Sequence, residues 1–160
     1  MTPKAIGTGR RAAAASLAVA IALAPAATLA QDFDNQIAAR QGQMRVQAAN
    51  LGVLVGMARG EIEYDAEAAQ VAADNLATVS EIDQRFFWPE GSGIMYSSDT
   101  KALPEIWDDY DDFISKWEAY GEAATALQAV AGDGQQAMAG GLQQVGNACG
   151  ACHEDYQQSD

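Results

Sequence analysis

Apolar side chains recur at alternating steps of three and four residues in four segments of this chain, and no segment shows the strict alternation typical of a strand. Turn-forming residues separate the four segments at 60–64, 89–103 and 132–134. Asp65 can cap the second helix, and Pro104 suits the first turn of the third. Because two of the three connections are short, neighbouring helices should run antiparallel. The sequence therefore predicts an all-α fold, an antiparallel up-down four-helix bundle.

The residues at these spacings are the ones that we expect in the core. The first stripe comprises Ile37, Gln41, Met44, Ala48, Leu51, Val55 and Ala58. The second, interrupted by a polar residue at 83, comprises Ala69, Ala72, Leu76, Val79 and Phe86. The third comprises Ile106, Tyr110, Phe113, Trp117, Tyr120, Ala124 and Leu127. The fourth comprises Met138, Leu142, Val145, Cys149, Cys152 and Tyr156.

The first thirty residues differ from the rest of the chain. They contain three basic residues and no acidic one, and an apolar run over 12–23 is followed by small residues up to Ala30. This order is typical of a secretory signal peptide, and the run is shorter than the roughly 20 residues that a membrane-spanning helix needs. We predict a cleaved signal peptide over 1–30 and a single exported domain over 31–160 without a membrane span.

The predicted domain is strongly acidic. It holds six basic residues against twenty-two acidic ones, which gives a formal charge of −16. A nucleic-acid-binding surface needs clustered basic residues, so this composition excludes one. A protein partner should instead present a basic or locally neutral patch, and salt should slow the association.

The only histidine and both cysteines lie within five residues, as Cys149-Gly150-Ala151-Cys152-His153. This C-x-x-C-H pattern is the attachment sequence for c-type haem. On a helix, positions three and four apart share a face, so both thiols can form thioethers with the haem vinyl groups while His153 reaches the iron. A redox disulfide motif usually follows a strand, and a zinc site needs four ligands, so both fit less well. The sequence predicts one covalent haem c, attached through Cys149 and Cys152, with His153 as its iron ligand.

The second axial position of this iron cannot be filled by histidine, because the chain has no other. That position is therefore occupied by methionine or a weak ligand, or it is empty. Met138 lies on the same predicted helix as His153 and cannot cross the haem, whereas Met44 lies in the middle of the first stripe. The spacing leaves open whether Met44 is an iron ligand, a wall of the haem pocket or a core residue.

Over its whole length the predicted domain resembles the class II c-type cytochromes, the group that contains cytochrome c prime. Members of that family have four helices and carry the haem motif near the C-terminus of the chain. The matching residues are Arg40-Gln41 with Met44 three residues on, Gly60, Pro104-Glu105-Ile106-Trp107, Phe113, Val145-Gly146 before the haem motif, and Tyr156.

The resemblance implies roles for individual residues. Arg40 and Gln41 match positions near the haem propionates, and Met44 matches the residue that faces the distal side of the iron. Trp88, or its neighbour Phe87, lies about where the family often places an aromatic residue of the distal pocket. Family members commonly carry Arg or Lys at the position of Gln157, and the missing cation implies a somewhat lower reduction potential.

The resemblance also implies a function. It favours a periplasmic protein for one-electron transfer, with a five-coordinate, high-spin iron that binds nitric oxide and carbon monoxide. The alternative within the family is a low-spin carrier with Met44 as sixth iron ligand. We expect periplasmic redox partners, a homodimer through the first two helices and no enzymatic activity, since no cluster of nucleophile and base is visible. A haem-free exported interaction module is the alternative outside the family.

Overall fold

The structure is a computed structural model that describes Met1 and residues 32–159. The chain separates into two units, Met1–Gln31 and Asp32–Asp160, and only the second is described below. The predicted signal peptide, apart from Met1, lies outside the described residues, as does its cleavage site.

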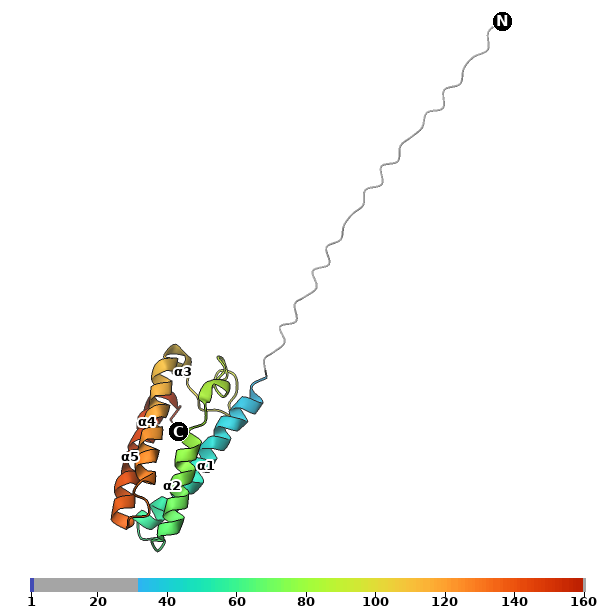
Figure 1. Ribbon diagram of the computed structural model, residues 1–160. Helices are drawn as coiled ribbons and strands as arrows, with labels where there is room; N and C mark the ends of the chain where they lie inside the picture. The colour runs from blue at the N-terminus through green and yellow to red at the C-terminus, as the bar shows by residue number, and fades with distance from the viewer. Residues whose placement is uncertain (2–31, 160) are drawn as a thin grey trace. The chain divides into compact units, whose positions relative to one another are not determined.

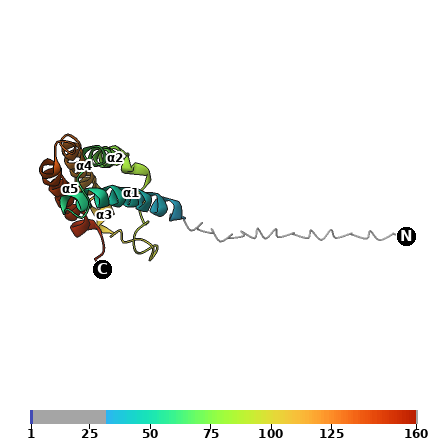
Figure 2. The same cartoon turned by 90° about the horizontal axis from the view of Figure 1, so that it is seen from below.

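Four long helices build the second unit (Figure 1), and they are α1 (Asp34–Ala58), α2 (Ala66–Ser80), α4 (Tyr110–Gln128) and α5 (Gln135–Tyr156). Helix α1 packs against α2 and α5, and α4 packs against the same two helices. Each helix thus has two antiparallel neighbours, and the view from below shows the closed arrangement (Figure 2). The predicted antiparallel four-helix bundle is confirmed.

Two short helices lie in the long connection between α2 and α4. They are η1 (Gln84–Phe86) and α3 (Glu105–Asp108). The predicted third helix is therefore interrupted, because Asp109 leaves the helical conformation and its carboxylate accepts a hydrogen bond from the Asp112 amide at 3.1 Å. Aspartate competes in this way with helix continuation, and the same bond caps α4. The predicted cap of α2 is confirmed, since Asp65 accepts from the Ala68 amide at 2.8 Å.

The core lies along the bundle axis. All four long helices contribute fully buried side chains to it, among them Leu54, Leu76, Leu127, Met138 and Val145. The third stripe is confirmed, with Phe113, Tyr120 and Leu127 buried. The second stripe is confirmed only as far as Val79. The prediction for Phe86 is wrong, because α2 ends at Ser80 and the Phe86 side chain is 75% exposed.

Helix α1 buries a face that differs in part from the one predicted. Met44 is 36% exposed and Ala48 is exposed, whereas Arg40, Gln43 and Gln47 are buried. The predicted stripe is confirmed at Ile37, Leu51 and Ala58, which are buried or pack against the core, and is wrong at Met44 and Ala48. Polar side chains of α1 are buried instead through hydrogen bonds that apolar spacing cannot reveal. Within the described part of the chain, no helix has the combination of length and apolar character that spanning a bilayer requires.

Candidate functional site

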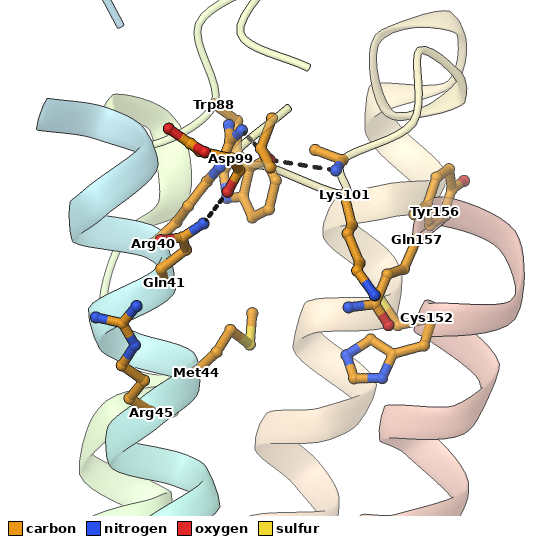
Figure 3. A pocket seen from close by; sticks show the side chains of 13 residues that line it. Arg40, Gln41, Met44, Arg45, Trp88, Asp99, Lys101, Cys152, Tyr156 and Gln157 are labelled. Atoms are coloured by element: carbon orange, nitrogen blue, oxygen red, sulfur yellow. Dashed lines mark hydrogen bonds between the residues drawn. The ribbon is translucent and has the colours of Figure 1, made fainter. Parts of the chain in front are cut away.

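A cavity of about 690 Å³ opens between the first half of α1, the segment around residues 88–102 and the end of α5 (Figure 3). Six of the seven residues predicted for the site line it: Arg40, Gln41, Met44, Trp88, Cys152 and His153. Cys149, the seventh, is half-buried one turn earlier on α5 and packs against the bundle core. The fold therefore gathers residues from three separate parts of the sequence.

The last turns of α5 carry Cys149, Cys152 and His153. Both thiols are free, and burial raises the pKa of Cys149 and raises that of Cys152 to about 11. Desolvation lowers the pKa of the His153 imidazole, which favours the neutral form that ligates metals. No group of three or more His, Cys, Asp or Glu side chains is arranged as a metal site within residues 32–159. The donor set on α5 suits a cofactor that brings its own metal.

The end of α5 is fixed by Tyr156 and its neighbours. The Tyr156 hydroxyl donates a hydrogen bond to Asp112 at 2.6 Å, and its ring packs edge-on against Phe113. Ala102 and Gln157 form an antiparallel bridge, and the Gln158 amide donates to a loop carbonyl, that of residue 101, at 2.8 Å. These contacts join the loop to α5 and form one rim of the cavity.

Arg40 is buried, with 3% of its surface exposed, and links α1 to the loop. Its guanidinium donates to the Ser92 hydroxyl at 2.8 Å, to the Ser92 carbonyl and to the Thr100 hydroxyl at 2.9 Å. It also lies 4.5 Å from the centroid of the Trp88 ring. Burial lowers the pKa of Arg40 to about 10, and no carboxylate in the described residues forms an ion pair with it.

Gln41 and Met44 occupy the cavity wall on α1. The Gln41 amide donates to the Asp99 carbonyl and so fixes the loop at a second point. The Met44 side chain extends from α1 into the cavity, and Cys152 of α5 lies on the opposite side (Figure 3). His153, the next residue of α5, lines the same cavity. The Met44 sulfur accepts a hydrogen bond from the buried Gln47 amide at 3.8 Å.

Trp88, and not Phe87, supplies the aromatic wall. The indole Nε1 donates to Gln84 at 3.0 Å, and the ring packs edge-on against Phe113 with centroids 4.7 Å apart. Phe87 contributes only its carbonyl, which accepts a long bond of 3.4 Å from Arg40. The sequence left the choice between these two neighbours open.

Cations gather at this cavity in an otherwise acidic domain. Of the six basic residues after position 31, three line it, namely Arg40, Arg45 and Lys101, against one acidic residue, Asp99. A buried guanidinium without a carboxylate partner is costly, so an anionic group in the cavity would stabilise it. Haem carries two carboxylates and a flat apolar ring, and the cations, the thiols and the apolar walls present here fit it.

Sequence reasoning missed five residues of the cavity wall: Arg45, Asp99, Thr100, Lys101 and Ala102. The last four lie in the loop that returns to α5 through the bridge between Ala102 and Gln157. No local pattern in the sequence predicts a pairing of residues this far apart. Arg45 follows Met44 directly, and only the direction of its side chain, which a stripe does not give, places it at the cavity.

Comparisons with known proteins agree with this site. The family model described as Cytochrome C' matches residues 35–157. Cytochrome c-554 of Cereibacter sphaeroides is 40% identical over 148 residues, which cover 91% of this chain and 97% of that protein. A solved cytochrome c' from Rhodobacter sphaeroides is 35% identical with a TM-score of 0.78, covering 81% of this chain and all of that one.

A further solved structure is a nitric oxide complex. It is a mutant of cytochrome c prime from Alcaligenes xylosoxidans, 27% identical, with a TM-score of 0.70 and coverage of 81% of this chain and 98% of that one. The match covers nearly the full length of each of these relatives. The similarity therefore extends over the whole bundle and includes both sides of the cavity.

Proposed function

This chain belongs to the cytochrome c prime family, and on that premise we propose that it is an exported one-electron carrier whose haem iron keeps an open face for nitric oxide and carbon monoxide. Cytochromes of this family carry covalent haem c, and the chain has the two cysteines of the attachment motif. The haem supplies the one-electron couple and the site for a diatomic ligand.

The observation that carries the proposal is that His153 of α5 and Met44 of α1 line one and the same cavity. His153 is the chain's only histidine, so the side of the cavity opposite it offers the iron no second imidazole. Cys149 and Cys152 would hold the ring at α5, and His153 would bind the iron. An open face results as long as the Met44 sulfur stays at the wall.

The remaining residues would hold and shield the cofactor. Arg40, Arg45 and Lys101 would neutralise the haem carboxylates at the cavity, and the bonds of Arg40 to the loop fix its position. Trp88 and Met44 line the same cavity as His153 and would limit the space left beside a bound haem to small ligands. Binding of small gases is supported by the Alcaligenes relative, which was solved as a nitric oxide complex.

A specific observation also favours the second candidate, a low-spin carrier in which Met44 is the sixth iron ligand. The Met44 side chain points into the cavity toward the α5 side, where Cys152 lies (Figure 3) and where His153 is the next residue. A thioether there is a suitable axial ligand and would raise the reduction potential. The two candidates differ in whether the sulfur leaves the wall.

The setting of the protein is part of the proposal. The first thirty residues carry the pattern of a signal peptide, and c-type haem is attached outside the cytoplasm, so we place the protein in the periplasm. We propose redox partners with basic or neutral patches, a homodimer through α1 and α2, and no enzymatic turnover.

The test uses holoprotein made with the haem attachment machinery. We expect a mass that includes one haem, and a reduced optical spectrum of the high-spin type that converts completely with carbon monoxide. A split low-spin spectrum that resists carbon monoxide, with a methionine–iron band lost in Met44→Ala, would establish the second candidate instead. Protein that is purified from the periplasm without haem would contradict both candidates and favour a haem-free interaction module.

A further inference from the structure

The Met44 sulfur is hydrogen-bonded to its own helix. Gln47 lies three residues after Met44 on α1, and its Nε2 donates to the Met44 sulfur at 3.8 Å. Gln47 is buried, with 6% of its surface exposed, whereas Met44 is 36% exposed at the cavity. The bond therefore joins a fixed interior donor to the flexible side chain of the cavity wall.

Gln47 has no other acceptor for this amide. Among the hydrogen bonds of residues 32–159, the Met44 sulfur is the one acceptor of Gln47 Nε2. A buried amide that loses its partner destabilises the protein by the full desolvation penalty. Moving the sulfur away would leave this amide unpaired inside the bundle, so the bond restrains Met44 more than a solvent-exposed bond would.

The direction of the restraint follows from the geometry. The Met44 side chain projects from α1 into the cavity, and Cys152 of α5 lies on the far side (Figure 3). His153 follows Cys152 on α5 and lines the same cavity. Gln47 belongs to α1 and the bond is already 3.8 Å long, so a sulfur that left α1 to reach the α5 side of the cavity would break it. Methionine has three rotatable bonds and changes conformation readily, so a single restraint shifts the populations that it samples.

We propose that Gln47 is a positioning residue that holds the Met44 sulfur at the α1 wall and so weakens its competition for the iron bound by His153. The inference rests on the proposed haem site, and it deepens that function by naming the residue that sets whether the iron face is open. It acts through Met44 alone, which makes a double substitution decisive.

The chain offers a matched control one turn earlier. Gln43 is also a glutamine of α1 and is also buried, with 8% of its surface exposed. Its Oε1 accepts a hydrogen bond from Gln84 at 3.0 Å, and it makes no contact of this kind with the Met44 sulfur. Gln43→Leu therefore removes a buried amide from the same helix and leaves the restraint intact.

The experiment is a carbon monoxide titration of ferrous holoprotein. The variants are Gln47→Leu, Gln43→Leu, Met44→Leu and the double variant Gln47→Leu/Met44→Leu. Gln47→Leu should lower the carbon monoxide affinity about two- to fivefold, the range of one weak neutral hydrogen bond. It should also strengthen the methionine–iron band of the oxidised protein. Gln43→Leu should leave both readouts close to wild type, and Met44→Leu should abolish the effect of Gln47→Leu.

Equal affinity in wild type and Gln47→Leu would overturn the inference, and so would an effect that persists without Met44. Gln47→Ala, which has no donor and adds no group that could bind the iron, replaces Gln47→Leu if that variant does not fold. The wild-type spectrum tests the proposed function separately. A wild type that already resists carbon monoxide refutes the open face, while the order of affinities among the variants still tests Gln47.

Discussion

Replacing Arg40 by methionine removes the guanidinium that joins α1 to the cavity loop and keeps an unbranched side chain of similar length. Three short bonds disappear, to the Ser92 hydroxyl at 2.8 Å, to the Ser92 carbonyl and to the Thr100 hydroxyl at 2.9 Å. The contact with the Trp88 ring at 4.5 Å is lost as well. The acceptors of the loop are then left without their buried donor.

The size of the effect follows from opposing contributions. Hydrogen bonds from a charged donor contribute about 1.5–3 kcal/mol each, and bonds in one network are not additive. Burial opposes them, as the fall in the pKa of Arg40 to about 10 indicates. We therefore expect Arg40→Met to lower the free energy of unfolding by about 2–4 kcal/mol, less than the sum of the three bonds.

The assay is urea unfolding of the holoprotein, followed by circular dichroism, together with amide hydrogen exchange in the loop. Arg45→Met is the matched control, because Arg45 lines the same cavity from the same helix but is exposed. That control should stay within about 0.5 kcal/mol of wild type. If Arg40→Met lowers the free energy of unfolding by less than about 1 kcal/mol and leaves amide hydrogen exchange in the loop unchanged, the anchoring role of Arg40 is refuted.

Gly93→Ala should destabilise the protein by about 1–3 kcal/mol in the same unfolding assay, since an added Cβ would lie 2.7 Å from the Ala102 carbonyl. Gly146→Ala on α5 meets nothing within 4 Å and should stabilise by about 0.5–1 kcal/mol. In a redox titration, Gln157→Arg should raise the reduction potential by about 20–40 mV, the effect of one exposed cation on the oxidised iron; an unchanged potential would contradict this. In haem-free protein, burial raises the pKa of Cys152 from 9.0 to about 11. The folded state thus keeps a proton that the unfolded state loses, so the stability of haem-free protein should fall as the pH rises from about 9 to about 11. The fall should be smaller in holoprotein, where the sulfur is a thioether and does not titrate.

How far the sequence predicts this fold depends on where each contact partner lies. The stripe through Phe113, Tyr120 and Leu127 was predictable because its burial follows from helical spacing alone. The buried face of α1 was not, because Arg40 is satisfied by Ser92, a partner 52 residues away in the sequence. A buried polar residue looks like a surface residue until its partner is known.

The functional site also has parts that the sequence predicts and parts that it does not. The haem motif is contiguous, so its three chemical groups could be read directly, and Met44 could be placed opposite them from its position on the first helix. The cavity loop could not be placed, since Lys101 reaches the site only through the pairing of Ala102 with Gln157. The restraint of Met44 by Gln47 was also out of reach, because the sequence predicts neither residue's side-chain direction.

The coordination number of the reduced iron tests the central claim most directly. Resonance Raman spectra of the ferrous holoprotein distinguish a five-coordinate iron, bound by histidine alone, from a six-coordinate one. The open face proposed between His153 and Met44 predicts the five-coordinate, high-spin pattern, unchanged in Met44→Leu. A six-coordinate, low-spin pattern in wild type that becomes five-coordinate in Met44→Leu would contradict the open face and make Met44 the sixth ligand.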